Sequence, residues 1–576
     1  MRRLCAADRP PVTSCGPARA RTQERGVPVA DKPSTLRELA DNDPDRHDVY
    51  IALVAPLGAS TEHVLATLSA VLDGQYGYQV NHVQLSLLLD DIVGLSTGIL
   101  PRRGEPHYHK RRMNAGDELR RMAGDDSALA ALAIAKIAAT KTTGPTAHVL
   151  VSLKHPREAA LLKKVYGSAL WLVSVVQDSD ERLANLANQL GEASGSFEPA
   201  PESAATLLMA RDEADEDARH GQHVRDVFSA ADFFLPVRQG VPLTPTVERF
   251  LSGVFGAPFL SPRLEEEAMR HAQAAALRSA AVGRQVGAVT IPPGGTPYVL
   301  GTNEVPKPGG GQYREGDQPD HRDFQGGVDP NPAYTQRVLR EVMDRLASGG
   351  YFTQERNEAG GAAVLREALA PDADGKAVLD GTRARALIEF TRCLHAEQAS
   401  IANAARSGTS IGGGRLFSTT FPCHECAKFI IGAGIVEVQY IEPYPKSLVR
   451  ELYRDLIDAR PPLDAVGNDD EILSRGRVPF RPFLGFAPTR YDEVFVAKAR
   501  RTQGRVSQHT PRSAYPVGLG WSRSAVETAQ DEVVVAVAAI VQEIGLSAIK
   551  TTPSERVDDS QEADSDAAVP NVEETG

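Results

Sequence analysis

The sequence predicts an α/β protein of two domains, and the placement of its apolar segments is the main reason. Short apolar runs bounded by turn residues lie at 48–54, 148–153 and 169–176, and a helical pattern follows each of them. Such runs are typical of the buried strands of a parallel sheet with helices on both faces. A proline-rich linker and a second alternation of helices and strands come next. We therefore expect one domain over residues 47–245 and another over 255–500.

The two ends of the chain lack the pattern of either domain. Residues 1–46 are rich in Arg, Ala and Pro and have little periodicity, which predicts a disordered leader. Residues 501–576 are expected to be a C-terminal extension. It carries one apolar helical run at 532–544 and an acidic end after Thr551, so we expect its end to be largely disordered.

The composition limits the classes of function. The chain has 576 residues, of which 42% are apolar, so it can bury substantial cores. A net charge of -12 and a pI near 5.7 argue against a polynucleotide groove, so no DNA substrate is expected. No apolar run is long enough to predict a membrane span. The cysteines suggest no disulfide framework, which favours a cytoplasmic protein; they are Cys5, Cys15, Cys393, Cys423 and Cys426.

The segment after the first strand has the layout of a phosphate-binding loop. Strand, small-residue loop and helix follow one another, and the loop offers Gly58, Ser60 and Thr61 as candidate nucleotide contacts. It departs from the pattern G-x-x-x-x-G-K-S/T because no lysine precedes the hydroxyl. Two interpretations stay open. Either backbone amides bind a nucleotide such as ATP, GTP or a dNTP, or the domain is a kinase-like scaffold that has lost its chemistry.

The second domain is predicted to open with a helix and then to alternate strands and helices. Its expected elements are helices at 264–281, 395–407 and 423–433 and strands at 284–291, 298–303, 415–420 and 437–441. Residues 306–329 have the Gly, Asp and Pro content of a loop. Residues 331–385 are predicted to be helices broken by Gly and Pro, which suggests an insertion.

The most specific pattern in the chain is His395-Ala-Glu397, followed downstream by Pro422-Cys-His-Glu-Cys426. Residue types, order and spacing match the H-x-E and P-C-x-x-C signature of zinc nucleobase deaminases. His395, Cys423 and Cys426 are the expected zinc ligands, and a catalytic zinc site keeps its fourth position for water. Zinc lowers the pKa of such a water to about 7. Glu397 is then expected to carry protons to the ring nitrogen and the departing amine.

Two other interpretations of this pattern explain less of it. A closed structural zinc knuckle requires a fourth ligand, for which His424 is the nearby candidate. A redox C-x-x-C pair leaves the upstream H-x-E unexplained.

Several longer strings resemble the deoxycytidylate deaminase family. They are Arg284-Gln-Val-Gly-Ala, Gly301-Thr-Asn-Glu-Val-Pro306, Cys393-Leu-His-Ala-Glu397 and Phe421-Pro-Cys-His-Glu-Cys-Ala-Lys-Phe-Ile-Ile431. Two further strings are Gly309-Gly-Gly-Gln-Tyr-Arg-Glu-Gly-Asp317 and Tyr440-Ile-Glu-Pro-Tyr-Pro-Lys446. Together with the kinase-like first domain, they resemble the two-domain anti-phage deoxycytidine nucleotide deaminases of bacteria. The resemblance covers roughly residues 48–500. It implies a P-loop kinase-like parallel sheet domain followed by a cytidine-deaminase-like three-layer α/β/α domain.

The resemblance also implies an activity and its partners. Zinc-dependent hydrolysis would convert free dCTP, and dCMP, to deoxyuridine nucleotides, and so deplete the dC nucleotide pool during phage infection. A homo-oligomer is implied, as is restraint by a small antitoxin RNA in some members. By position, Asn303 would contact the sugar or base, and the segment Ser418-Thr419-Thr420, with Thr419 at its centre, would offer backbone to the leaving amine. Arg284, Lys307 and Arg322 would contact phosphate.

Other functions stay open at this point. A housekeeping dCMP deaminase for dTMP supply is one, and a nucleic-acid cytosine or adenosine deaminase, which shares the zinc motif, is another. In a regulatory protein, the first domain would instead sense a nucleotide and the zinc would only be structural. Cys393 departs from the family pattern, which has a small aliphatic residue at that place.

Overall fold

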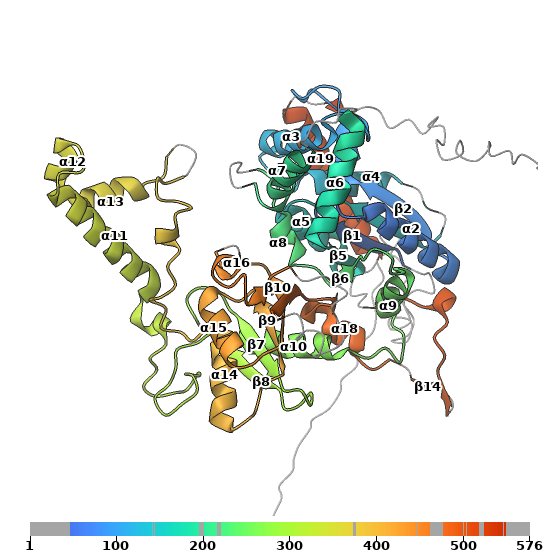
Figure 1. The fold of residues 1–576 in the computed structure, drawn as a ribbon. Coiled ribbons are helices and arrows are strands. Elements are labelled where there is room, and N and C mark those ends of the chain that lie inside the picture. The colour runs from blue at the N-terminus through green and yellow to red at the C-terminus, as the bar shows by residue number, and fades with distance from the viewer. Residues whose placement is uncertain are drawn as a thin grey trace, which may run out of the picture. The chain divides into compact units, whose positions relative to one another are not determined.

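The structure is a computed structural model, and it describes most of the chain from residue 47 to residue 548 (Figure 1). The ranges outside the description are 1–46, 141, 143, 195–200, 216–219, 373–375, 445, 461–475, 499, 503, 518–522, 545–546 and 549–576. The expected leader and the acidic end after Thr551 therefore lie outside the described residues.

The first sheet has six strands in the order β13-β6-β5-β1-β4-β2. Five of them are parallel; they are β1 (Val49–Val54), β2 (Gln79–Gln84), β4 (Thr146–Val151), β5 (Leu170–Val176) and β6 (Phe233–Pro236). The three apolar runs predicted as strands are thus confirmed as β1, β4 and β5. Because β1 is a central strand, the loop that follows it lies in the middle of the sheet's carboxyl edge.

Helices cover both faces of this sheet, which explains why β1 is apolar throughout. Alternate β1 residues from Val49 to Leu53 belong to one buried cluster with α2 (Thr61–Val71) and α9 (Thr244–Val254). The intervening residues from Tyr50 to Val54 belong to a second cluster with α3 (Tyr108–Ala123), α4 (Ala128–Ala139) and α5 (Pro156–Tyr166). A strand buried on both faces has no polar side to present to water.

The second sheet has the order β11-β12-β10-β9-β7-β8. Its strands are β7 (Gly287–Ile291), β8 (Val299–Thr302), β9 (Arg415–Thr420), β10 (Glu437–Glu442), β11 (Ile457–Asp458) and β12 (Val478–Pro482). The β9–β10, β10–β12 and β11–β12 pairs are parallel, whereas β7 is antiparallel to both β8 and β9. The predicted strand at 284–291 starts later than expected, at Gly287.

The second sheet is the middle layer of three. Phe417 of β9 packs with α10 (Leu264–Ala276) on one face, and Leu416 packs with α14 (Ala396–Ser407) and α15 (His424–Gly432) on the other. The expected insertion contains α11 (Pro330–Ser348), α12 (Gln354–Ala359) and α13 (Gly361–Leu369), and α11 packs against α13. The chain therefore has a mixed α/β fold with two largely parallel sheets.

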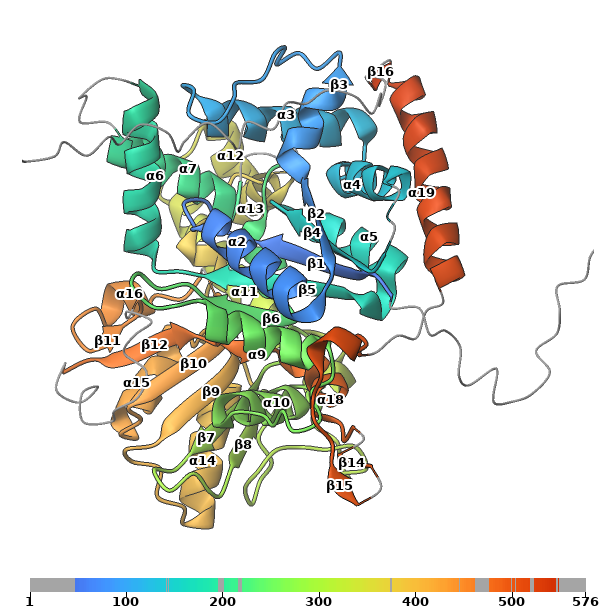
Figure 2. The same ribbon diagram turned by 90° about the vertical axis from the view of Figure 1, so that its right-hand side faces the viewer.

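Segments from the second half of the sequence complete the first sheet and its helical layer. Strand β13 (Gly485–Phe486) is antiparallel to β6, so Phe486 enters the core around Trp171 and Phe250. Helix α19 (Arg523–Glu543) packs beside α4 and α5, as Figure 2 shows. It contains most of the apolar helical run predicted at 532–544 and starts earlier. Among the described helices, none combines the length and apolar character that a membrane crossing requires.

Candidate metal centre and active site

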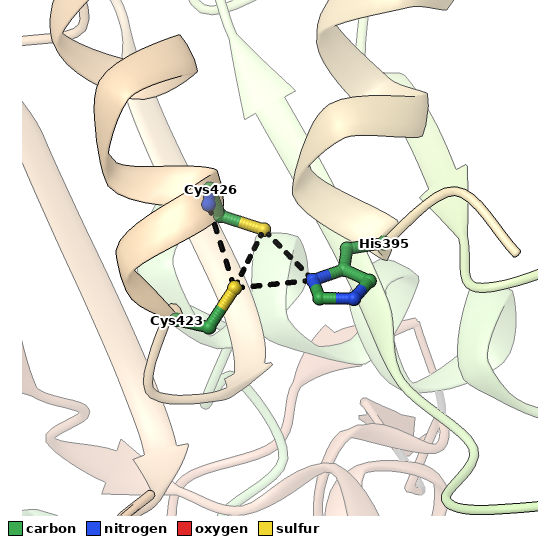
Figure 3. Close-up of side chains that lie close together, drawn as sticks. All are labelled: His395, Cys423 and Cys426. Atoms are coloured by element: carbon green, nitrogen blue, oxygen red, sulfur yellow. Dashed lines mark hydrogen bonds between the residues drawn. The ribbon is translucent and has the colours of Figure 1, made fainter. Parts of the chain in front are cut away.

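His395, Cys423 and Cys426 converge on one point (Figure 3). His395 Nδ1 lies 3.2 Å from Cys423 Sγ and 3.3 Å from Cys426 Sγ, and the two sulfur atoms are 3.6 Å apart. Tetrahedral zinc, with bonds of about 2.3 Å to sulfur and 2.0 Å to nitrogen, places such ligand atoms about 3.5–3.8 Å apart. The spacing and the donor set therefore fit a zinc ion, provided that the three ligand atoms move slightly apart when it binds.

Two helix starts bring these ligands together. His395 immediately precedes α14, and Cys423 immediately precedes α15, where its Sγ accepts a hydrogen bond of 3.4 Å from the Cys426 amide. Hydrogen bonding with Cys426, and then with His395, lowers the pKa of Cys423 to about 4. Burial raises the pKa of the Cys426 thiol. The thiolate form of Cys423 is thus favoured before any metal binds. A metal cation bound beside Cys426 would favour the thiolate form of that residue too.

Close backbone packing fixes the start of α14. A Cβ atom added at Gly301 of β8 would lie 2.0 Å from the carbonyl oxygen of Ala396 and 2.4 Å from the amide nitrogen of Ser400. Only a residue without a side chain allows β8 and the first turns of α14 to approach this closely. The position of the His395–Glu397 segment therefore depends on this glycine.

Glu397 lies beside the ligand cluster and is almost fully buried. Its Oε1 accepts a hydrogen bond of 3.0 Å from Ser418 Oγ, and its Oε2 accepts one of 3.3 Å from Cys426 Sγ. Burial raises the pKa of this carboxyl group, and the neighbouring Cys423 charge raises it further. A buried carboxyl group beside the metal position is a candidate proton carrier, and a raised pKa favours the protonated form that donates.

A cavity of about 240 Å³ opens onto His395, Cys423 and Glu397. Its walls come from the segment before β7, from the residues flanking α14, and from the residues between β9 and β10. Within the described residues, the ligand cluster comprises the three predicted ligands, and His424 is not among them. The side-chain positions therefore give no support to the alternative of a closed knuckle with His424 as its fourth ligand. The arrangement instead leaves an approach to the metal position from the cavity.

The structure brings two of the predicted substrate residues to this cavity. Asn303 lines it, and its side chain holds the segment before β7 by accepting from the Val286 amide at 2.7 Å and donating to the Arg284 carbonyl at 2.6 Å. Arg284 also lines the cavity, and its guanidinium group pairs with Glu442. Thr419 is buried, and its Oγ1 accepts a hydrogen bond of 3.2 Å from the Gly287 amide.

The other two predicted phosphate contacts stay outside the described lining of this cavity. Lys307 Nζ lies 2.5 Å from Asp317 Oδ1, and Arg322 lies 2.7 Å from Asp320 Oδ2 with its guanidinium group over the ring of Phe324. Both cations already have a carboxylate partner close by in sequence. A role for either of them in phosphate binding stays a prediction.

Several residues of the site were missed in the sequence. The resemblance implies only a backbone role for Ser418, and its hydroxyl group is the unexpected part. Ser418 lies two residues before Thr420 and therefore on the same face of β9, which is a usable signal. Asn331 and Tyr444 also line the cavity. Asn331 belongs to the insertion and Tyr444 to a loop, and nothing in their local sequence indicates a place beside Glu397.

The candidate nucleotide contacts lie in the first half, after β1. Gly58 has a φ of 84° and Ser60 donates through its amide to Gln177 Oε1 at 2.9 Å. Thr61 starts α2, and its hydroxyl donates to the Ala59 carbonyl at 3.3 Å. Nucleotide binding by these three residues stays a prediction.

Comparison with known proteins agrees with the geometry of the second half. Residues 262–442 match the family model described as the cytidine and deoxycytidylate deaminase zinc-binding region. A probable deoxycytidylate deaminase of Drosophila melanogaster is 43% identical over 74 residues, which is 13% of this chain and 33% of that protein. The deoxycytidylate deaminase of Enterobacteria phage T2 is 44% identical over 54 residues, 9% of this chain and 29% of that protein. The chain thus spans about a third of the length of these relatives.

Solved structures of the dCMP deaminase of cyanophage S-TIM5 also align with this chain. The apo structure has 16% identity and a TM-score of 0.18, and covers 38% of this chain and 99% of its own. The complex with dCMP and dUMP has 18% identity and a TM-score of 0.19, and covers 39% and 98%. The part of the chain that is similar to the cytidine and deoxycytidylate deaminase zinc-binding region therefore contains the cluster of His395, Cys423 and Cys426.

Proposed function

We propose that this protein hydrolyses the amino group from free deoxycytidine nucleotides, dCTP and dCMP, to give deoxyuridine nucleotides. The observation that carries the proposal is the meeting of a zinc ligand set and a buried carboxyl group in one cavity. His395 and Cys423 line that cavity together with Glu397, in a region that matches a deaminase model. A zinc bound there supplies a water whose pKa is close to neutrality.

The chain's own residues then account for the proton transfers. Glu397 would take a proton from the water and deliver it to the ring nitrogen as the water oxygen bonds to the ring carbon. Transfer of the second proton of that oxygen to the amino group would let the C–N bond break and ammonia leave. Ser418 donates its hydroxyl hydrogen to one carboxyl oxygen of Glu397, which restricts the orientation of that group. The backbone at Thr419 is the predicted acceptor for the departing amine, and Asn303 fixes the wall against which the sugar or base would lie.

A free nucleotide suits this cavity better than a polynucleotide. The cavity is small, at about 240 Å³, and Asp323 and Asp329 add carboxylates to its lining beside the guanidinium group of Arg284. The chain as a whole carries a net charge of -12. Both features disfavour a long polyanion.

We further propose that the reaction depletes the dC nucleotide pool during phage infection, in a cytoplasmic homo-oligomer that a small RNA restrains. This part is supported by the sequence resemblance to two-domain anti-phage deaminases. The second candidate is a housekeeping dCMP deaminase for dTMP supply. It is favoured by the relatives, which are named deoxycytidylate deaminases.

A substrate panel separates these functions. The full-length zinc-loaded protein is incubated with dCTP, dCMP or a cytosine-containing single-stranded oligonucleotide, and products are identified by mass. The proposal expects deoxyuridine products from both free nucleotides and an unchanged oligonucleotide. Turnover of dCMP alone favours the housekeeping function, and turnover of the oligonucleotide alone contradicts the proposal.

A further inference from the structure

The loop between β1 and α2 lies where parallel sheets commonly bind ligands. In the first sheet β4 and β2 lie on one side of β1, and β5 and β6 lie on the other, so the strand order changes direction at β1. Ligands of open α/β sheets bind outside the carboxyl ends of the strands at such a point. The loop presents backbone amides there, ahead of the N-terminus of α2.

An internal carboxylate already interacts with this loop in the way a bound anion would. Asp212, near the end of α7 (Pro201–Glu213), is 1% exposed, and its Oδ2 accepts a hydrogen bond of 2.8 Å from the Leu57 amide. Its Oδ1 lies 2.7 Å from Lys154 Nζ. Lys154 follows β4 and also donates to the Ala55 carbonyl at 3.0 Å. Lys154, in the segment after the neighbouring strand β4, therefore supplies the positive charge that the loop sequence lacks.

A cavity of about 530 Å³ adjoins this carboxylate. Asp212 and Pro56 line it together with Arg182, which reaches the loop by donating to the Leu57 carbonyl at 3.2 Å. Arg225 adds a further guanidinium group to the lining, and Tyr440 also lines this cavity. Its volume is within the range of about 300–1,000 Å³ that small-molecule sites occupy.

We propose that this edge of the first sheet is a binding site for a nucleoside polyphosphate that Asp212 keeps closed. In the bound state a phosphate group takes the place of the Asp212 carboxylate between the Leu57 amide and Lys154, and the remainder of the ligand lies in the adjoining cavity. The ligand binds only the molecules in which the carboxylate has moved away, so its apparent affinity is reduced by the fraction of such molecules. The alternative is that the Asp212–Lys154 pair only stabilises the loop.

The test removes the carboxylate and measures binding of a phosphate chain. The full-length zinc-loaded protein is titrated calorimetrically with inorganic tripolyphosphate and with ATP at constant ionic strength. We expect Asp212→Ala to bind both probes about tenfold more tightly than the wild type, or better, because a competing anion has been removed. The double variant Asp212→Ala/Lys154→Met is expected to lose this gain.

Glu213→Ala is the matched control, because Glu213 lines the same cavity and its removal changes the net charge equally. Unlike the buried Asp212 that precedes it in the sequence, Glu213 is exposed. If Asp212→Ala does not fold, Asp212→Asn keeps the shape of the side chain, and a rise in its melting temperature with tripolyphosphate is the readout. The proposal is overturned if the Asp212 variants bind no more tightly than the wild type, if Glu213→Ala gives the same gain, or if the gain survives loss of Lys154.

Discussion

Ser418 donates a hydrogen bond of 3.0 Å to Glu397, and both side chains are buried. Cys426 Sγ lies 3.3 Å from the other carboxyl oxygen, so the carboxyl group lies directly beside the metal position. The hydrogen bond from Ser418 restricts how far this group can turn toward the metal and become a ligand. Its orientation is what proton transfer requires.

Loss of the Ser418 hydroxyl is expected to lower kcat. In Ser418→Ala the carboxyl group loses its hydroxyl hydrogen-bond partner, so kcat should fall about 10- to 100-fold for deamination of dCMP, with KM nearly unchanged. Zinc content should stay at the wild-type value. Ser400→Ala is the matched control, since Ser400 is an equally buried serine whose hydroxyl donates to the Val299 carbonyl at 2.8 Å, away from Glu397. It should lower stability and leave kcat intact, and equal kcat losses in both variants would contradict the positioning role.

Glu397→Gln tests the proton carrier itself. The amide keeps the shape of the side chain but cannot carry protons, so the deamination rate should fall about 10²–10⁴-fold or more. Zinc content and melting temperature should be close to wild type. Glu425→Gln is the control, because Glu425 lies between the two cysteines in sequence but pairs with Lys428 at 2.5 Å. A Glu397→Gln protein that still deaminates at the wild-type rate would exclude the proposed role.

Cysteine variants separate the metal ligands from a buried bystander. Cys423→Ser is expected to lose zinc and activity, and its melting temperature should fall because the metal no longer joins α14 to α15. Cys393→Ser should keep one zinc per chain. Cys393 is also buried, but burial raises the pKa of its thiol to about 12, so it stays protonated and is not among the clustered ligand atoms. The zinc content of each purified variant is measured by metal analysis. Zinc retained by Cys423→Ser would contradict the assignment of Cys423 as a ligand.

Gly301→Ala is expected to destabilise the second half. The added methyl group would meet backbone atoms of α14 at 2.0 and 2.4 Å, so strand and helix must separate, at a cost of about 1–3 kcal/mol in the free energy of unfolding. Gly294→Ala is the control, since nothing lies within 4 Å of the place that its added methyl group would take. Chemical denaturation of both variants gives the comparison. If the two variants are equally stable, the close approach of β8 and α14 does not exist.

The parts of this structure that the sequence foretold are those that depend on local pattern. The three predicted zinc ligands and Glu397 lie within two short motifs, and the structure brings the ligand atoms of His395, Cys423 and Cys426 close together. The burial of β1 on both faces follows from its continuous apolar run. Strand β13 could not be foreseen, because two residues far along the chain pair with β6 and carry too little pattern to show it. The resemblance implies phosphate contacts for Lys307 and Arg322 from their positions. The nearby Asp317 and Asp320 compete for those charges, and that competition could have been read from the spacing.

The central claim is that water replaces the amino group of a cytosine ring at the site formed by His395, Cys423, Cys426 and Glu397. It is tested most directly by turnover of dCMP and dCTP in water enriched in a heavy oxygen isotope, with product masses compared between the wild type and Glu397→Gln. We predict deoxyuridine nucleotides that carry one heavy oxygen atom from the wild type, with release of one ammonia per product. Zinc-loaded wild-type protein that gives no deoxyuridine product, or gives it without the label, would contradict the account.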